Sequence, residues 1–327
     1  MATYKGIQGY TVQNLSSDPT ASSDTGGQLW YNSSSGKFKI VAAGAGAWSA
    51  GGNINRAGLW GQGSCGSQTA GLVATGTDLT GTTVNAETYD GSSWTQIADV
   101  NSARYGNGGA GVITAALTFA GAPVPSTGAL TESYNGTAWT EVADLNEARH
   151  YVASTNYSPA TACLCMGGGP PTPAQDWIEE YNGTSWAALT ALTVGRRQGA
   201  GAGTTTSALY FGGKNPSSTA VATTESWNGT AWTEVADLAS TRKEMAGAGS
   251  SNTNALVYGG SPYTAICEKW NGTSWTEVGD LSQARHFTTS IGTNSTALAG
   301  GGGNPTTYVG TEEWNDPVYT VKTVTVS

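Results

Sequence analysis

The fold of this chain is decided by one stretch, which runs Glu132-Ser133-Tyr134-Asn135-Gly136-Thr137-Ala138-Trp139-Thr140-Glu141-Val142-Ala143-Asp144-Leu145-Asn146-Glu147-Ala148-Arg149. Its tryptophan recurs in six copies with steps of 46, 45, 47, 46 and 43 residues: Trp48, Trp94, Trp139, Trp186, Trp232 and Trp275. A period of that length is typical of propeller blades or repeat arrays. The stretch is therefore one unit of a repeated structure.

An arginine follows each tryptophan, ten residues later in five copies and eight residues later in the first. These arginines are Arg56, Arg104, Arg149, Arg196, Arg242 and Arg285. Each copy also has an apolar run that ends in glycines, such as Leu209-Tyr210-Phe211-Gly212-Gly213. The order predicts an apolar strand closed by a glycine pair, then a strand with glutamate and an aromatic residue, then the tryptophan strand.

Composition predicts an all-β protein. Charged residues make up only 11% of the chain, 47 of its 327 residues are glycine, and no stretch has a sustained helical period. Many short strands joined by tight turns have this composition. A closed ring grows by adding blades, so one large domain is favoured over two.

The two ends of the repeat predict how the ring closes. One glutamate per repeat stands two residues before an aromatic residue: Glu87, Glu132, Glu179, Glu225, Glu268 and Glu312. The last of these strands has no tryptophan strand after it, while Trp48 has no complete blade before it. Because an unpaired strand edge is unfavourable, we expect a six-bladed propeller whose last blade is completed by the N-terminal strand of Trp48.

The repeated charges and turns receive structural interpretations. A catalytic group is needed once and not six times, so a structural arginine–glutamate pair in each repeat is favoured over a ring of catalytic acids and bases. The Asn-Gly and Asp-Gly pairs are expected to be turns between strands. The four cysteines are expected to be buried thiols, because Cys163 and Cys165 lie two apart on one strand.

Residues that differ between copies indicate where recognition would occur. In a meander, the loops between second and third strands and the blade-to-blade connections emerge on one face, and variable loops on a rigid frame commonly bind ligands. The candidate ligand-binding residues on that face are Tyr105, His150, Asp176, Trp177, Arg197, Lys243, Tyr263, His286 and Tyr308. Two alternatives remain open: ordinary solvated loops, or a face that packs on a neighbouring subunit.

No catalytic residue, metal site or cofactor is predicted. His150 and His286 are the only histidines, occupy one repeat position, and belong to blades three apart, so we expect them across the channel from each other. A metal site there would lack a third ligand.

The ordered Gly-Gly, Glu-x-Tyr and Trp elements resemble kelch propellers over residues 47 to about 316. Kelch propellers include protein-binding modules and galactose-oxidase-like copper enzymes. The resemblance to the copper enzymes would require a Tyr–Cys cofactor, and nothing singles out such a pair. The turns also depart from the Ser-x-Asp-x-Gly-x-Thr-Trp pattern of sialidases. The chain is therefore not expected to be an enzyme, although a carbohydrate-active propeller remains an alternative.

The ends of the chain are a different kind of sequence. Gly27 to Ile40 reads as a hairpin around Asn32 to Gly36, and residues 1–45 resemble segments that precede repeat domains in bacteriophage fibre proteins. The expected organisation is a virion-attachment arm over 1–45, a six-bladed kelch propeller over 46–316, and a closing or attachment strand over 317–327.

These features together predict a bacteriophage virion protein on the particle surface. It would contact other virion proteins through its arm, form a homo-oligomer in the particle, and bind a glycan or protein of the host as part of a tail fibre or spike. The open alternative is a capsid-decorating protein with no ligand. A net charge of −9 disfavours nucleic acid and anionic membrane as partners.

Overall fold

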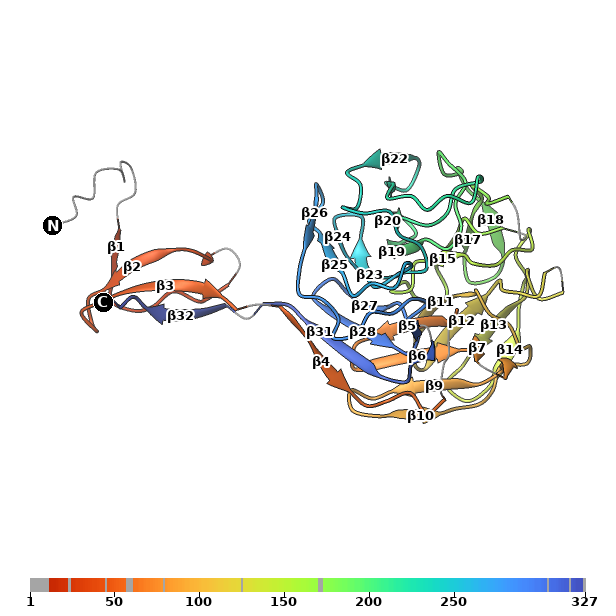
Figure 1. The fold of residues 1–327 in the computed structure, drawn as a ribbon, viewed down its shortest axis with the longest axis horizontal. Coiled ribbons are helices and arrows are strands. Elements are labelled where there is room, and N and C mark those ends of the chain that lie inside the picture. Colours follow the sequence, from red (N-terminus) through yellow and green to blue (C-terminus); the bar gives the residue numbers. More distant parts are fainter. Residues whose placement is uncertain are drawn as a thin grey trace. The chain divides into compact units, whose positions relative to one another are not determined.

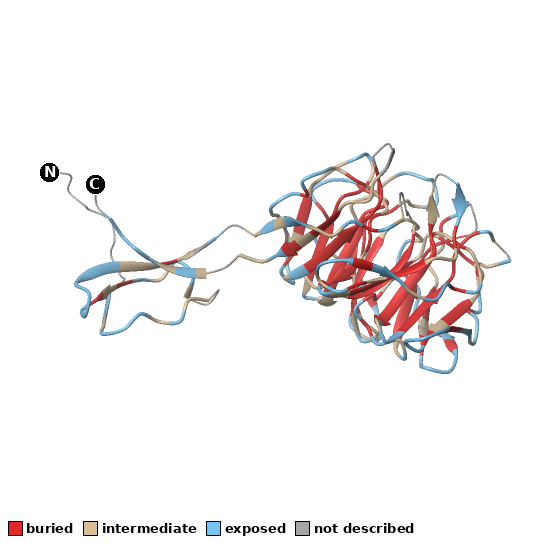
Figure 2. Cartoon of the chain, turned by 90° about the horizontal axis from the view of Figure 1, so that it is seen from below, coloured by how far each residue is buried: buried red, intermediate tan, exposed pale blue. Residues whose placement is uncertain are grey.

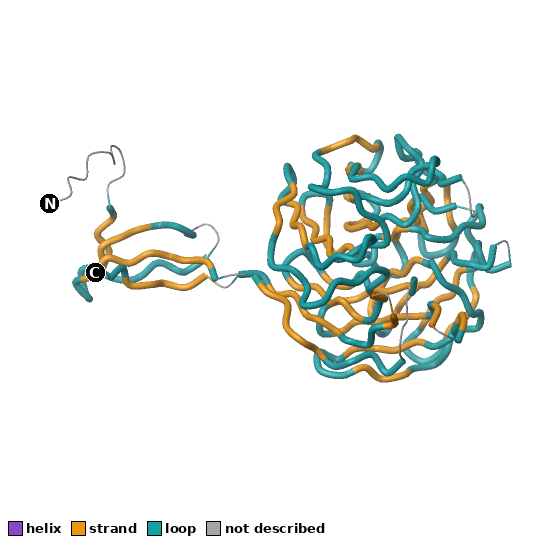
Figure 3. Tube along the Cα trace, in the orientation of Figure 1, coloured by secondary structure: helices purple, strands orange, loops and turns teal. Residues whose placement is uncertain are grey.

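The computed structural model describes residues 12–22, 25–44, 46–56, 61–78, 80–124, 126–169, 173–304, 306–317 and 319–325. The chain divides into two compact units, of which one comprises Trp48–Asn315 and the other Met1–Ala47 with Asp316–Ser327. Within the described ranges the structure consists of strands and loops (Figure 3), so it holds no helix that could cross a membrane.

The larger unit is a ring of four-stranded antiparallel sheets, and its described residues form six of them (Figure 1). Blade 1 contains β5 (Gly63–Ser67), β6 (Ala70–Ala74), β9 (Ala86–Tyr89) and β10 (Trp94–Gln96). Blade 2 contains β11 (Gly108–Val112), β12 (Ala115–Phe119), β13 (Thr131–Tyr134) and β14 (Trp139–Glu141). Blade 3 contains β15 (Ala153–Ser154), β16 (Cys163–Met166), β17 (Ile178–Tyr181) and β18 (Trp186–Ala188).

The remaining three blades complete the ring. Blade 4 contains β19 (Ala200–Thr204), β20 (Ser207–Phe211), β21 (Thr224–Trp227) and β22 (Trp232–Val235). Blade 5 contains β23 (Ala246–Ser251), β24 (Asn254–Tyr258), β25 (Cys267–Trp270) and β26 (Trp275–Glu277). Blade 6 contains β27 (Ile291–Gly292), β28 (Thr296–Gly300), β31 (Thr311–Asn315) and β4 (Ala47–Gly51). Two short hairpins, β7 (Thr77–Asp78) with β8 (Gly81–Thr82) and β29 (Gly303–Asn304) with β30 (Thr306–Thr307), lie outside the blades.

The predicted ring closure is confirmed. The N-terminal strand β4 pairs with β31, so blade 6 combines both ends of the larger unit. The innermost strands of neighbouring blades contact one another around the ring, β27 meeting β5 as well as β23. The six sheets therefore pack against one another in a closed circle, and no blade stands at a free end.

The repeated aromatic residues pack in pairs within each blade. Tyr134 lies directly opposite Trp139 in the β13–β14 register, with ring centroids 5.0 Å apart. The same pair recurs in blade 6 across the closure, where Trp48 and Trp314 are 5.7 Å apart. Such pairs contribute about 0.5–1.5 kcal/mol beyond the burial of their area. The tryptophan period of the sequence is therefore the period of a cross-strand aromatic contact.

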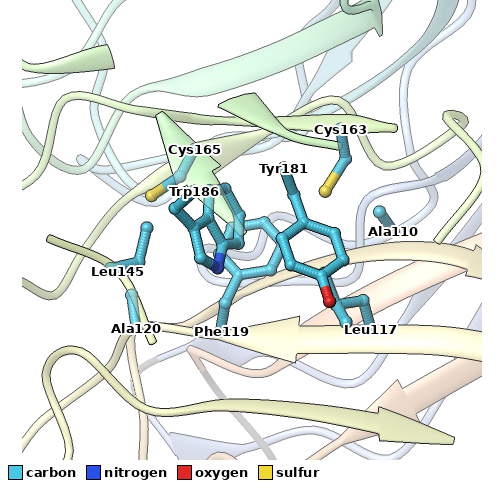
Figure 4. Close-up of a cluster of buried hydrophobic side chains, with 9 residues drawn as sticks. All are labelled: Ala110, Leu117, Phe119, Ala120, Leu145, Cys163, Cys165, Tyr181 and Trp186. Atoms are coloured by element: carbon cyan, nitrogen blue, oxygen red, sulfur yellow. The ribbon is translucent and has the colours of Figure 1, made fainter. Parts of the chain in front are cut away.

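Apolar clusters lie between neighbouring blades, and Figure 2 shows buried residues through the strands of the larger unit. One cluster joins blade 2 to blade 3, with Phe119 packed edge-on against Trp186 at 4.9 Å (Figure 4). Cys163 and Cys165 belong to it. All four cysteines are buried and free, and burial raises the pKa of the Cys165 thiol to about 11. These thiols act as small apolar side chains.

The arginine–glutamate pairs fasten each blade-to-blade connection to the blade that follows it. Five buried pairs are present: Arg104–Glu132, Arg149–Glu179, Arg196–Glu225, Arg242–Glu268 and Arg285–Glu312. In blade 2, the second carboxylate oxygen of Glu132 accepts from the backbone N–H of Asn101 at 2.7 Å and from its Nδ2 at 2.8 Å. Each of these buried arginines is thus paired with a carboxylate, as burial of a charge requires. The buried Nε atoms of Arg104, Arg149, Arg196 and Arg242 have no hydrogen-bond partner among the described residues.

The first repeat departs from this pairing. Arg56 donates to Asp78 at 2.6 Å through Nε, whereas Glu87 accepts from the backbone of Asn55 and Arg56 and from the Asn55 side chain. The expectation of an arginine–glutamate pair in each repeat is therefore wrong for the first repeat, because the β7–β8 hairpin of this blade places the Asp78 carboxylate within reach of Arg56.

The predicted turns are present on the outer strands. Gly136, between β13 and β14, has φ of +91°, and the Asn135 side chain accepts from the backbone N–H groups of Thr137 and Ala138. Only a residue without Cβ adopts that backbone at no cost, and the asparagine holds the turn from inside.

The smaller unit is a four-stranded sheet in the order β1 (Gln13–Leu15), β2 (Leu29–Asn32), β3 (Lys37–Ala43) and β32 (Tyr319–Thr323). The β2–β3 hairpin turns where the sequence predicts it. Trp30 is fully buried and donates to Asp18 at 3.2 Å. Of the two alternatives for residues 317–327, ring closure is wrong, because β32 pairs with β3 and completes this sheet.

Candidate functional site

One backbone position repeats at the channel mouth of each blade from 2 to 6. The residue after the repeat arginine forms a β-bridge with a residue just beyond the glycine pair of the same blade. The bridges are Tyr105–Ala122, His150–Gly169, Arg197–Lys214, Lys243–Ser261 and His286–Gly303. Ala57, at the corresponding place in the first repeat, lies outside the described residues. The shared bridge explains why five of the predicted site residues occupy equivalent places.

The next residue of blades 2 to 6, together with Gly61 of blade 1, forms a ring of backbone around the channel. Its members are Gly61, Gly106, Tyr151, Gln198, Glu244 and Phe287, and each has φ between +50° and +69°. Their backbone N–H groups donate from blade to blade: Gly106 to Gly61 at 2.6 Å, Tyr151 to Gly106 at 2.6 Å, Gln198 to Tyr151 at 3.0 Å, Glu244 to Gln198 at 2.7 Å and Phe287 to Glu244 at 2.7 Å. We call these six residues the mouth ring.

Four members of the mouth ring adopt left-handed backbone although they carry side chains. Such a conformation costs roughly 1–3 kcal/mol for a residue other than glycine, and clusters of it are found at ligand sites. Tyr151, Gln198, Glu244 and Phe287 carry chemically different side chains, and all four residues line one cavity. The blade-to-blade hydrogen bonds hold that conformation in place.

Aromatic rings from opposite sides meet at this opening. Tyr151 and Phe287 stack with their ring centroids 5.7 Å apart and an interplanar angle of 23°. Tyr105 lies edge-on to Tyr151 at 5.9 Å, and His150 packs against Tyr151 at 4.4 Å.

On the other side, His286 lies 5.1 Å from Phe287, and Tyr263 lies edge-on to His286 at 4.8 Å. A continuous series of ring contacts therefore joins the two histidines across the mouth. We call its six residues the mouth series: Tyr105, His150, Tyr151, Phe287, His286 and Tyr263. Tyr263 is 47% exposed and forms its open end.

Glu244 is the charged group at the centre of this series. Its carboxylate accepts from Lys243 at 2.5 Å and lies 2.8 Å from Nδ1 of His286. Burial alone would raise the pKa of Glu244, but the hydrogen bonds from His286 and Lys243 outweigh it, so that the pKa is lowered. The carboxylate is therefore ionised near neutral pH and positions both neighbours.

His150 and Tyr151 are held in their neutral forms. Burial lowers the pKa of His150, and the nearby Arg197 lowers it further. Burial likewise raises the pKa of Tyr151 to about 12. Nδ1 of His150 is buried and has no hydrogen-bond partner among the described residues. This side of the mouth presents neutral rings, while the other side carries charges.

A narrow cavity of about 80 Å³ extends inward from the mouth ring, whose six residues all line it. The rest of its wall includes several glycine and serine residues of the inner strands, because blades approach one another closely there. A Cβ added to Gly109 would lie 2.7 Å from the backbone nitrogen of Ser64. The cavity has room for several water molecules. An oligosaccharide is larger than this space, so it would rest on the mouth.

The structure separates the remaining predicted site residues from the mouth series. The Tyr308 ring lies over the buried guanidinium of Arg285 at 4.4 Å, so it packs within blade 6. Asp176 and Trp177 immediately precede β17, where the Trp177 carbonyl accepts from Gly167. Among the described residues, the ring contacts of the mouth include neither side chain.

Sequence reasoning missed Tyr151, Gln198, Glu244, Phe287 and Lys214. The first four stand two residues after the repeat arginine, and that constant spacing is the signal that could have found them. Within the described part of the chain, no group of three histidine, cysteine, aspartate or glutamate side chains could hold a metal ion.

The comparisons with known proteins concern the fold. The chain matches no family model and no curated protein. The solved structure of YjhT is similar to it, with a TM-score of 0.63 at 12% sequence identity, over 83% of this chain and 99% of that chain. At that identity the likeness shows the β-propeller fold alone.

Proposed function

We propose that this chain is a non-enzymatic, kelch-type propeller that binds a saccharide of a host surface at its channel mouth and is carried on a bacteriophage particle. The observation that carries the proposal is the series of ring contacts from Tyr105 through Tyr151 and Phe287 to Tyr263. Aromatic faces stack on the apolar faces of sugars, and neighbouring polar groups supply directional hydrogen bonds.

The charge and size of the mouth also favour a small polar ligand. The acidic chain, with net charge −9, disfavours a nucleic acid. The cavity of about 80 Å³ at the mouth is too small for an oligosaccharide, so most of such a ligand would lie on the open surface. Such a surface suits a chain end or a short segment of a glycan.

A glycan array probed with the full chain tests this function. We expect binding to one class of glycan, lost in Tyr263→Ala and Tyr105→Ala but retained in Tyr157→Ala. Tyr157 is 43% exposed and lies in the β15–β16 connection, outside the mouth series. Absence of glycan binding together with binding to a host protein would replace the saccharide by a protein ligand, and absence of both would favour a capsid-decorating role.

A carbohydrate-active enzyme is the second candidate, and Glu244 is the observation that favours it. This buried carboxylate lies 2.8 Å from a histidine at the mouth, an arrangement that can transfer protons. Glycoside hydrolysis usually needs two carboxyl groups flanking the bond. Of the described residues in the mouth ring and the mouth series, Glu244 is the one that carries a carboxyl group. Release of reducing ends from a bound oligosaccharide, abolished by Glu244→Gln, would establish the enzyme.

Attachment to the particle is proposed for the smaller unit. The proposal rests on the resemblance of residues 1–45 to fibre segments and on the separate sheet that β1, β2, β3 and β32 form. Removal of residues 1–44 and 317–327 together should leave the propeller folded, because β4 and β31 remain, and should abolish incorporation into particles. Normal incorporation of the shortened chain would place the attachment site on the propeller.

A further inference from the structure

The positive charges of the propeller are concentrated in one sector of the channel mouth. The six repeat arginines leave four further cations in residues 48–315: Arg197, Lys214, Lys243 and Lys269. Three of these, Arg197, Lys214 and Lys243, belong to the bridges of blades 4 and 5 at the mouth. We call these three residues the basic sector.

Blade 4 differs from the other blades in the partner of its bridge. The residue opposite the post-arginine position is small elsewhere: Ala122, Gly169, Ser261 and Gly303. In blade 4 it is Lys214, which exchanges both backbone hydrogen bonds with Arg197, at 3.0 and 2.8 Å. Residues paired in this way project their side chains from the same face. Two cations therefore leave the sheet side by side.

Lys243 adds a third charge from the neighbouring blade. It is close enough to lower the pKa of the Lys214 ammonium, which burial lowers first, and Arg197 acts in the same direction. Glu244 offsets one of the three cations through its 2.5 Å contact with Lys243. Like charges directly opposite each other destabilise a sheet. The fold maintains this arrangement at a cost that a bound anion would relieve.

Aromatic and hydrogen-bonding groups adjoin the basic sector. Arg197 precedes Gln198, whose backbone N–H donates to the Tyr151 carbonyl at 3.0 Å. Its charge acts to lower the pKa of both His150 and Tyr151. Glu244 connects the sector to His286, and the His286 ring in turn packs against Tyr263. All three cations are half-buried, a position in which long cationic side chains pack their aliphatic stems. A stacking surface and an oxyanion site thus lie next to each other.

We propose that the basic sector binds the carboxylate or sulfate group of an acidic saccharide, with the sugar ring placed on the neighbouring aromatic side chains. This inference rests on the proposed saccharide-binding function and specifies its ligand class. The Arg197 guanidinium can donate two parallel hydrogen bonds to such a group, and the two ammonium groups act as point charges beside it. A neutral saccharide would gain no ionic interaction with these cations.

The test is calorimetric titration of the full chain with three oligosaccharides of equal length: one containing glucuronate, one sulfated and one neutral. The decisive variant is Lys214→Ser, which copies Ser261 of blade 5 at the same bridge and should fold normally. The control is Lys37→Ser, which removes an exposed lysine of the smaller unit. We expect tighter binding of one acidic oligosaccharide than of the neutral one, weakened roughly tenfold or more by Lys214→Ser and unchanged by Lys37→Ser. Which acidic ligand binds distinguishes carboxylate from sulfate.

Salt supplies an independent readout, because an ion-paired ligand should bind more weakly as ionic strength rises, and less steeply so in Lys214→Ser. Equal binding of neutral and acidic ligands, or binding of acidic ligands that Lys214→Ser leaves intact, would overturn this inference while the saccharide function stands. Binding of none of the three here, with no binding on the glycan array either, would overturn the saccharide function itself.

Discussion

Tyr151 and Phe287 stack across the channel mouth with ring centroids 5.7 Å apart, although they belong to blades 3 and 6 and are 136 positions apart in the sequence. Both have left-handed backbone, with φ of +55° and +50°. Blades 1 and 2 place Gly61 and Gly106 at the same position, with similar φ. The propeller therefore accommodates glycine there, and the two aromatic residues are additions to the frame.

Tyr151→Gly should separate ligand binding from folding. Glycine adopts the required φ without strain, which offsets part of the packing lost with the ring, so we expect the melting temperature to change little. Binding of the glycan found on the array should fall at least tenfold, since a stacking contact is removed. Unchanged affinity in a folded Tyr151→Gly variant would remove this ring from the binding surface.

Arg149→Ala should lower stability and spare binding. The arginine is fully buried and pairs with Glu179 at 3.2 Å, while the same carboxylate accepts from Asn146 through its other oxygen. Because those bonds remain, we expect a loss of about 1–3 kcal/mol in the free energy of unfolding by denaturant. Arg56→Ala is the comparison: its side chain is 33% exposed and pairs with Asp78, so its loss should be under about 1 kcal/mol. Equal effects would contradict the assigned roles.

A hydroxyl on the third strand should stabilise the contact between blades. Trp186 of blade 3 donates through Nε1 to Thr131 of blade 2 at 3.0 Å. At the next contact, between blades 3 and 4, Ile178 takes the place of Thr131. There Nε1 of Trp232 is buried and has no hydrogen-bond partner among the described residues. Thr131→Val keeps the shape and removes the acceptor, so we expect unfolding free energy to fall by about 1–3 kcal/mol. Thr131→Ser, which retains the hydroxyl, should cost less, and the opposite order would refute the contact.

Acid should destabilise the propeller through His150. Burial depresses its folded-state pKa below the unfolded value of about 6.5, so the unfolded chain binds the proton more readily. The neutral histidine is accommodated above that pH, and stability is lost as the pH falls below it. His150→Tyr, which copies Tyr105 of blade 2, should show a shallower loss of unfolding free energy between pH 7 and pH 5. An identical slope in both proteins would show that another group carries the acid sensitivity.

The sequence predicts the repeated part of the structure because the same contact recurs. Trp48 has to find an aromatic partner, and Trp314 is the one strand aromatic without a tryptophan strand after it, so ring closure follows from the repeat. Arg56 does not follow the arginine–glutamate pairing of the other repeats, because the first repeat contains a hairpin with its own carboxylate, Asp78.

The mouth ring could not be predicted from residue type. Its members share a backbone conformation and a hydrogen bond, while their side chains run from glycine to glutamate to phenylalanine. The position of the Tyr308 side chain could not be predicted either, because the repeat fixes the strands and not the conformation of the loop that carries this residue. In this structure it lies over Arg285.

Hydrogen exchange of the full chain, with and without the glycan found on the array, tests the central claim most directly. We expect slowed exchange of backbone amides at Tyr105–Gly106, His150–Tyr151 and His286–Phe287, which border the mouth, and no change at the Asn-Gly turns on the opposite face. Protection confined to those turns, such as Asn135–Gly136, or to strands of the smaller unit would contradict the assignment of the channel mouth as the binding surface.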